Sequence, residues 1–365
     1  MTAAPRPRLV YERWTDPVAH ELLAAGDAVD LVHLDLDAPA ADGWTALRGA
    51  HGYQVATRTD VSRVDGGAQW LADRALLGHC PQLLAVSVAG AGFDVVDVAA
   101  CTEAGVIVCN NSGPGAEAVA EHALGLMLSL AKNITAADRL LRSGHLRDRA
   151  VLTGGELKGK VLGVIGLGAI GARLVELCAP FAMTVLAHDP YVDPVTARRR
   201  GVQLVALDEL LARSDFVQVT CPLPPETAGL VGARELALMQ PSAFFITTAR
   251  GGIHDEAALL HALTAGRIAG AGLDVFADEP PRADNPLLSL DTVVATPHVA
   301  GITREAKHDL AVATAEQWQE IFAGAVPPRL LNPAAWPRYS ERFTEAFGRS
   351  PAALPTTPTP AGIPA

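Results

Sequence analysis

Cysteine and positive charge are both scarce in this chain. Only five of the 365 residues are cysteines. They form no C-x-x-C pair, so neither a disulfide framework nor a zinc site is expected, and we predict no bound metal. The formal net charge is -11, which repels the phosphate backbone of nucleic acid and the anionic surface of a membrane. We therefore expect neither of these as a partner.

Long apolar runs are missing as well. The first residues contain no apolar core of a signal peptide, and no stretch of about 18 uncharged apolar residues occurs. We therefore expect a cytoplasmic protein. The length and the 49% hydrophobic content predict two domains, each with a core of its own.

A glycine motif is the most informative feature that is present. Gly166, Gly168 and Gly171 form G-x-G-x-x-G directly after the apolar run Val161–Ile165, where a buried strand is expected to turn into a helix. Such glycines allow a tight turn, leave room for a pyrophosphate and let the helix pack close to the strand. Asp189 stands about 20 positions further on, where a carboxylate accepts hydrogen bonds from an adenosine ribose. This order of parts predicts a dinucleotide site.

Short apolar strands alternate with helical patterns on both sides of this motif, which predicts parallel α/β architecture. We predict a doubly wound Rossmann nucleotide-binding domain over residues 113–300. A smaller, discontinuous flavodoxin-like α/β substrate domain is expected from residues 1–112 and a return segment, 301–335. The proline-rich stretch 336–365 is expected to be largely disordered, because it cannot bury a core. The predicted strands cover residues 29–34, 53–57, 83–88, 106–109, 161–165, 184–188, 215–220, 243–247, 269–274 and 292–295, and the predicted helices include 70–77, 95–103, 116–131, 208–213, 233–239, 255–265 and 303–322.

Three polar residues follow successive predicted strands of the Rossmann domain: Arg250, Glu279 and His298. Hydride transfer to a carbonyl requires a proton donor, and histidine is the usual choice. A neighbouring carboxylate favours the charged imidazole, and a guanidinium can hold the carboxylate of a keto acid. Each residue alone is more typical of a turn or a structural loop. Together, downstream of a dinucleotide motif, they predict an active site.

The stretch Ala89-Gly90-Ala91-Gly92 follows the predicted strand 83–88. Its backbone N–H groups could hold a substrate carboxylate. The same pattern is equally typical of a tight turn before a helix. The residues alone leave both interpretations open.

Four runs resemble the signatures of the D-isomer-specific 2-hydroxyacid dehydrogenase family. They are Val164–Gly171, Ala249–Glu256, Gly272–Pro280 and Thr296–Gly301, and they occur in the family's order. The resemblance implies an NAD-dependent oxidoreductase that interconverts a small D-2-hydroxy acid and its 2-keto acid.

The resemblance also assigns roles to residues. It implies Arg250 as the substrate-binding arginine, His298 as the acid and base, and Glu279 as the partner of His298. It further implies that Ala89, Gly90, Ala91 and Gly92 bind the substrate carboxylate, and that the helix Gly115–Leu130 lies in a homodimer interface. The implied cofactor contacts are Gly166, Gly168, Ala169, Ile170, Gly171, Asp189, Cys221, Pro222, Thr227, Thr248, Ala249, Asp274, His298 and Gly301.

The sequence favours one cofactor but leaves several substrates open. Asp189 would repel a 2′-phosphate, so NAD is favoured over NADP, and the run Arg198–Arg200 is expected to be a solvated face. Glu279 argues against a formate dehydrogenase, in which a glutamine pairs with the histidine. We expect no added regulatory domain of the kind found in many phosphoglycerate dehydrogenases. Hydroxypyruvate, glyoxylate and other small 2-keto acids stay open as substrates.

Two alternatives remain at this point. One is a phosphite dehydrogenase-like enzyme on a related scaffold. The other is a non-catalytic, NADH-sensing co-repressor-like protein, which the acidic charge disfavours.

Overall fold

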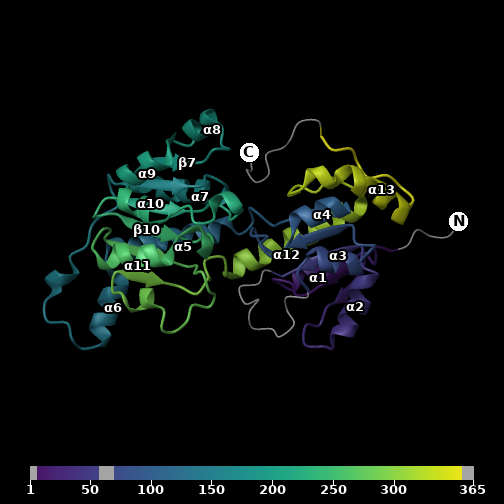
Figure 1. The fold of residues 1–365 in the computed structure, drawn as a ribbon, viewed down its shortest axis with the longest axis horizontal. Helices are drawn as coiled ribbons and strands as arrows, with labels where there is room; N and C mark the ends of the chain where they lie inside the picture. The colour runs from purple at the N-terminus through teal and green to yellow at the C-terminus, as the bar shows by residue number, and fades with distance from the viewer. Residues whose placement is uncertain (1–5, 57–69, 356–365) are drawn as a thin grey trace. The chain divides into compact units, whose positions relative to one another are not determined.

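The computed structural model describes residues 6–56 and 70–355 (Figure 1). The chain divides into two compact units. Residues 1–115 and 303–365 belong to the first, and residues 116–302 belong to the second. The chain therefore passes from one unit to the other after residue 115 and after residue 302, just beyond the boundaries expected at residues 112 and 300. In the described part of the chain, no helix combines the length and apolar character needed to cross a bilayer.

The first unit contains a five-stranded sheet in which all strands are parallel, in the order β2-β1-β3-β4-β5. This is the flavodoxin-like order, as expected. Strands β3 to β5 are buried along their whole length. The strands are β1 (Arg8–Tyr11), β2 (Asp30–His33), β3 (Gly52–Val55), β4 (Ala85–Val88) and β5 (Ile107–Cys109).

Helices cover this sheet, and aspartate or threonine side chains begin several of them. Asp73 accepts from the Leu76 amide, so α3 begins at Arg74 and not at Trp70 as predicted. The helices of this unit are α1 (Val18–Ala24), α2 (Ala40–Arg48), α3 (Arg74–His79), α4 (Val98–Ala104), α12 (Arg304–Ala323) and α13 (Trp336–Phe347), with a 3-10 turn η7 (Pro333–Ala335).

Helix α12 packs against α1 and the sheet of the first unit. The indole Nε1 of Trp318 donates to Oε1 of Gln54 in β3 at 2.7 Å. Gly52 lies directly under this ring, since a Cβ there would come within 2.5 Å of Trp318. The return segment thus belongs to the core of the first unit.

Helix α13 corrects one expectation. Residues 336–347 form a helix with a buried face, so the prediction that 336–365 is largely disordered is wrong for this part, and residues 356–365 lie outside the described residues. Four aromatic residues at helical spacing make that face, and the proline in the first turn is compatible with a helix. The four are Trp336, Tyr339, Phe343 and Phe347.

The second unit contains a seven-stranded parallel sheet in the order β12-β11-β10-β9-β6-β7-β8. The strand order reverses between β6 and β9, as in a doubly wound Rossmann sheet, which confirms the predicted fold class. Its strands are β6 (Val161–Ile165), β7 (Thr184–His188), β8 (Val202–Leu204), β9 (Phe216–Val219), β10 (Phe244–Thr247), β11 (Gly270–Leu273) and β12 (Val293–Ala295).

Two apolar clusters cover the two faces of this sheet. Leu162 and Val164 of β6 belong to the cluster with α5 and α7, whereas Ile165 belongs to the one with α9, α10 and α11. This alternation follows the period of two in a strand. The helices are α5 (Ala116–Ala131), α6 (Ile134–Arg142), α7 (Ala169–Cys178), α8 (Pro194–Arg199), α9 (Leu207–Arg213), α10 (Ala233–Leu238) and α11 (Glu256–Thr264). The 3-10 turns are η2 (Arg149–Leu152), η3 (Ala179–Phe181), η4 (Pro225–Thr227), η5 (Gly251–Ile253) and η6 (Pro286–Ser289).

Candidate active site

The glycine motif forms the turn between β6 and α7, and its three glycines have different surroundings. Gly166 has φ +95°, and a Cβ there would lie 2.7 Å from the Cys221 amide nitrogen. A Cβ on Gly171 would lie 2.3 Å from the Gly166 carbonyl oxygen. A Cβ on Gly168, in contrast, would meet no atom within 4 Å. Gly166 and Gly171 therefore serve the turn and its packing, while Gly168 leaves open space at the start of α7.

Two side chains support this turn from neighbouring strands. The Thr220 hydroxyl, which follows β9, donates to the Gly166 carbonyl at 2.6 Å. Asp189, which follows β7, accepts from the Leu167 amide at 2.8 Å and from the Tyr191 amide at 2.9 Å. Ala169 and Ile170 form the first turn of α7, whose N-terminus therefore faces the same space. Backbone N–H groups and a carboxylate arranged in this way fit a pyrophosphate and a ribose.

The segment after β9 carries the predicted contacts Cys221, Pro222 and Thr227. Cys221 is buried, and burial raises the pKa of its thiol to about 11, so the thiol is protonated near neutral pH. The Thr227 hydroxyl donates to the Pro222 carbonyl at 2.7 Å, which closes this segment into a turn.

The segment after β10 carries Thr248, Ala249 and Arg250. The Thr248 hydroxyl accepts from the Gln218 amide group at 3.1 Å, and Nη1 of Arg250 donates to the Ala249 carbonyl at 2.7 Å. The next residue, Gly251, approaches the segment that follows β11 so closely that a Cβ would lie 1.9 Å from the Phe276 carbonyl oxygen. The turn that bears Arg250 thus packs on the segment that leads to Glu279.

His298 and Glu279 are directly hydrogen bonded. Nδ1 of His298 lies 2.6 Å from Oε2 of Glu279, while Oε1 of the same carboxylate accepts from the Phe276 amide at 3.1 Å. A carboxylate only accepts, so Nδ1 carries the proton of this bond and Nε2 is left for a substrate. Both side chains are about one-fifth exposed, which suits a group that exchanges protons with a small molecule.

Asp274, predicted as a cofactor contact, is completely buried. Its Oδ1 accepts from the Val299 amide and its Oδ2 from the Ala300 amide, each at 2.9 Å. The carboxylate therefore anchors the loop that carries His298 and ends at Gly301. Its direct contact with a cofactor stays a prediction.

Sequence reasoning missed three polar residues of this site. The Thr296 hydroxyl donates to Oδ1 of Asp274 at 2.6 Å, and His122 of α5 lies 2.9 Å from the same hydroxyl. Glu256 accepts from the Ala277 amide at 2.6 Å. His122 could have been found from the sequence, because it is a polar residue within the largely apolar pattern of α5.

Arg250, Glu279 and His298 follow the carboxyl ends of the neighbouring parallel strands β10, β11 and β12, whereas His122 comes from α5 and Glu256 begins α11. The carboxyl edge of an open α/β sheet is the usual place for ligands.

The predicted loop Ala89–Gly92 follows β4 in the first unit. Its carbonyl groups are used by the chain itself: Gly90 accepts from the Asn111 amide at 2.8 Å, and Ala91 accepts from the Asn110 side chain at 2.8 Å. Because the peptide bond is planar and trans, the amides of the following residues point the opposite way. This geometry is compatible with an anion-binding turn.

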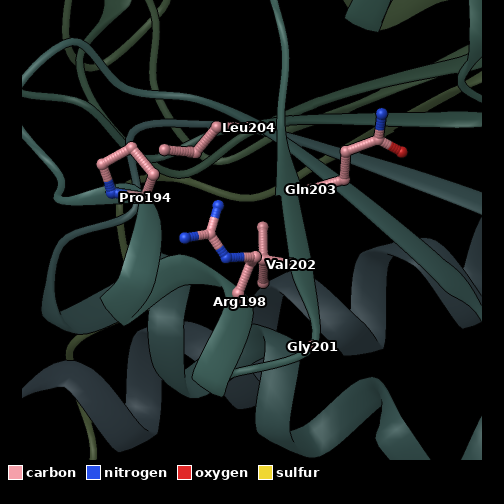
Figure 2. Close-up of a pocket in the computed structure, with 6 residues that line it drawn as sticks. All are labelled: Pro194, Arg198, Gly201, Val202, Gln203 and Leu204. Carbon is pink, nitrogen blue, oxygen red and sulfur yellow. The ribbon is translucent and has the colours of Figure 1, made fainter.

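A separate surface hollow of about 520 Å³ lies beside β8. Arg198 extends along it from α8, next to Pro194 (Figure 2). Strand β8 is at the opposite edge of the sheet from β12, which precedes His298. The hollow is therefore remote from the histidine. It is lined by Pro194, Arg198, Gly201, Val202, Gln203 and Leu204.

Comparison with known proteins relates this chain to one family. Residues 124–300 match the model described as D-isomer specific 2-hydroxyacid dehydrogenase, NAD binding domain. The chain is 44% identical over 260 residues to a D-3-phosphoglycerate dehydrogenase of Mycobacterium bovis, covering 71% of this chain and 49% of that protein. It is 38% identical over 263 residues to a glyoxylate reductase of Aeropyrum pernix, covering 70% of this chain and 78% of that protein.

A solved structure gives the same result for the fold. The D-lactate dehydrogenase of Aquifex aeolicus, complexed with NAD and lactic acid, matches with a TM-score of 0.75 at 25% identity, covering 89% of this chain and 98% of that one. This chain spans about half the length of the phosphoglycerate dehydrogenases that it matches. The sequence motifs, the two parallel sheets and these similarities agree, and the chain belongs to the D-isomer-specific 2-hydroxyacid dehydrogenase family.

Proposed function

We propose that this protein is an NAD-dependent oxidoreductase that interconverts a small D-2-hydroxy acid and its 2-keto acid. The observation that carries the proposal is the 2.6 Å hydrogen bond between His298 and Glu279 at the same sheet edge as the glycine motif. The relatives named for phosphoglycerate, glyoxylate and lactate support it, since each of these compounds is a 2-hydroxy or 2-oxo acid.

In the reductive direction, His298 is proposed to give the proton from Nε2 to the carbonyl oxygen of the substrate. Glu279 orients the ring through Nδ1 and stabilises the imidazolium before the proton leaves. A bound nicotinamide dinucleotide supplies the hydride in this direction and accepts it in the other.

Arg250 is proposed to bind the carboxylate of the substrate. Its planar guanidinium offers donors in a fixed fork, which matches the two oxygens of a carboxylate. The Ala89–Gly92 loop is proposed to bind the same chemical group through backbone amides.

We propose NAD as the preferred cofactor. The open space at Gly168 fits a pyrophosphate, and the Asp189 carboxylate fits a free ribose. A 2′-phosphate would bring negative charge next to Asp189 and be repelled.

We also propose a homodimer in the cytoplasm. The five cysteines are free thiols, which suits a reducing compartment. Exposed apolar side chains on α6 support the homodimer.

The test follows NADH absorbance with glyoxylate, hydroxypyruvate, pyruvate and 3-phosphohydroxypyruvate, and repeats each reaction with NADPH. We expect turnover with at least one acid and a lower kcat/KM with NADPH. His298→Ala should lower kcat by about 100-fold or more, because the proton donor is lost, while NADH affinity measured by fluorescence stays close to wild type.

His261→Ala is the matched control, since His261 is an exposed histidine on α11 of the same unit. It should turn over like wild type. Full activity in His298→Ala would contradict the proposal. Tight NADH binding without turnover on any acid would favour the NADH-sensing alternative.

A further inference from the structure

The loop that carries His298 has a backbone that needs support. His298 has φ +54°, in the left-handed region that few residues other than glycine adopt. Its amide donates to the Asp274 carbonyl at 2.7 Å, and the next two amides, of Val299 and Ala300, donate to the Asp274 carboxylate. The position of the histidine therefore depends on how the Asp274 side chain is held.

Asp274 is a fully buried carboxylate, which is costly unless it is paired. Of the basic side chains in residues 6–56 and 70–355, the imidazole of His122 is the one that comes within 4.0 Å of it. Nε2 of His122 lies 3.6 Å from Oδ1 of Asp274. The Thr296 hydroxyl is within hydrogen-bond distance of both groups.

The chemistry of the groups decides which atom donates and which accepts in the link formed by His122, Thr296 and Asp274. A hydroxyl has one proton, and Thr296 gives it to Oδ1 of Asp274 at 2.6 Å. The Thr296 oxygen must therefore accept from Nε2–H of His122, at 2.9 Å. This bond defines the ring nitrogen that carries the proton and the direction of the hydroxyl.

His122 comes from a firmly placed element. Helix α5 packs on β10, β11, β12 and α7 of its own unit, and the neighbours Ala120 and Ala123 are completely buried. The His122 side chain is 23% exposed. The helix therefore holds His122 in a fixed position, from which the ring can hydrogen bond to Thr296.

We propose that His122 is a positioning residue for the catalytic histidine, acting through Thr296 and Asp274 on the backbone of residues 298–300. His122 does not contact the substrate in this scheme; it keeps the loop in the shape that directs His298 to Glu279. The proposal rests on the proposed function, because it assigns a role within the same site.

The test uses the full chain with His122→Leu, His122→Gln and Thr296→Val. Glutamine can place an amide N–H near the position of Nε2, whereas leucine has no donor. We expect His122→Leu to lower kcat by about tenfold with little change in KM, and His122→Gln to restore most of the loss. His261→Leu on α11 is the control and should behave like wild type.

Thr296→Val removes the same link by a nearly isosteric change and is informative even if His122→Leu folds poorly. It should also lower kcat. The double variant should lose no more activity than Thr296→Val alone, because the His122 contact already depends on the Thr296 hydroxyl.

Amide hydrogen exchange supplies a readout that does not depend on activity. Exchange of the Val299 and Ala300 amides should be about tenfold faster in His122→Leu, unchanged in His122→Gln and unchanged in His261→Leu. Wild-type exchange at these two amides in His122→Leu would overturn the proposal, and so would faster exchange with wild-type kcat. If wild type turns over no acid, the proposed function fails, and the exchange rates alone decide whether His122 holds the loop.

Discussion

His254 is a buried titratable side chain that the proposed chemistry does not use. It follows η5 and is 4% exposed, with its ring 5.5 Å from the ring of Phe245. Among the residues that the structure describes, neither ring nitrogen has a hydrogen-bond partner. Burial lowers the pKa of His254 below its ordinary value of 6.5. The folded protein therefore favours the neutral form of this imidazole.

Acid should destabilise the protein partly through His254. Above pH 6.5 the imidazole is neutral in both states and adds no pH dependence. As the pH falls below 6.5 the unfolded chain takes up a proton that the folded protein resists, so stability is lost. Between pH 8 and pH 5, His254→Leu should lose less free energy of unfolding than wild type, by up to about 2 kcal/mol.

Urea unfolding at the two pH values measures this difference. His261→Leu changes an exposed histidine of the same unit and should follow wild type at both. If His254→Leu loses as much stability on acidification as wild type, the buried imidazole is not the cause.

Gly168 and Gly171 permit a matched pair of substitutions, because each adds the same methyl group. In Gly168→Ala the methyl enters open space, so the thermal midpoint should stay near wild type while NADH affinity falls by about tenfold or more. In Gly171→Ala it meets the Gly166 carbonyl at 2.3 Å, so stability should fall by about 1–3 kcal/mol. Thermal unfolding and NADH fluorescence separate the two results. Unchanged NADH affinity in Gly168→Ala would argue against a pyrophosphate at this turn.

At the scale of elements, α13 is held by charge as well as by its aromatic face. Arg338 donates to the Glu103 carbonyl, and Arg342 donates to the Ala104 carbonyl at 3.1 Å, both at the C-terminus of α4. Arg349, just beyond α13, donates to the Ala323 carbonyl at the end of α12 at 2.7 Å. Helix C-termini carry unsatisfied carbonyls and partial negative charge, which these guanidinium groups match.

The aromatic face of α13 should be essential for the stability of the first unit. Phe343 is fully buried between Tyr339 and Phe347. Phe343→Ala should lower the free energy of unfolding by about 3–5 kcal/mol, because it leaves a cavity in the core. Glu341→Ala, at an exposed position of the same helix, should change it little. Equal midpoints for the two variants in urea unfolding would show that α13 is dispensable.

The length of an element does not by itself explain which elements were predicted. Helix α5 and strand β7 have the predicted bounds. Strand β1 and strand β8 were missed, whereas other strands of three or four residues were predicted within slightly longer apolar runs. The pairing of β1 and β8 with β2, β3 and β7 depends on the rest of the sheet.

At the scale of the whole molecule, α6 has an apolar surface without a partner in its own unit. No residue of this helix is buried. Ile134 and Leu141 of α6 are 55% and 68% exposed, and Val151 of η2 is 69% exposed. Large apolar side chains that are exposed to this extent are typical of an interaction surface. A second copy of the chain is the proposed partner.

Sedimentation equilibrium tests the homodimer. One chain has a mass of 38.0 kDa, and wild type is expected at twice this value. Leu141→Glu combined with Val151→Glu should give monomers, because charges would be buried in the interface. Val195→Glu, at an exposed apolar position of α8, is the control and should remain dimeric. A monomeric wild type at micromolar concentration would rule the dimer out.

The sequence by itself determined the fold class and the proposed catalytic residues. Parallel strands end at one edge of a sheet, so Arg250, Glu279 and His298 could be assigned to that edge from strand order alone. Periodicity and turn chemistry depend on residues that are close in the sequence. They can therefore be recognised from the sequence alone.

The tertiary structure decided what joins distant segments. His122 and Thr296 are 174 positions apart, and no local pattern relates them. Likewise, the aromatic face of α13 packs with residues of α12 in one apolar cluster and is shielded from solvent. Such pairings depend on how helices and sheets pack in three dimensions, because packing brings together side chains whose own neighbours in sequence give no sign of the contact.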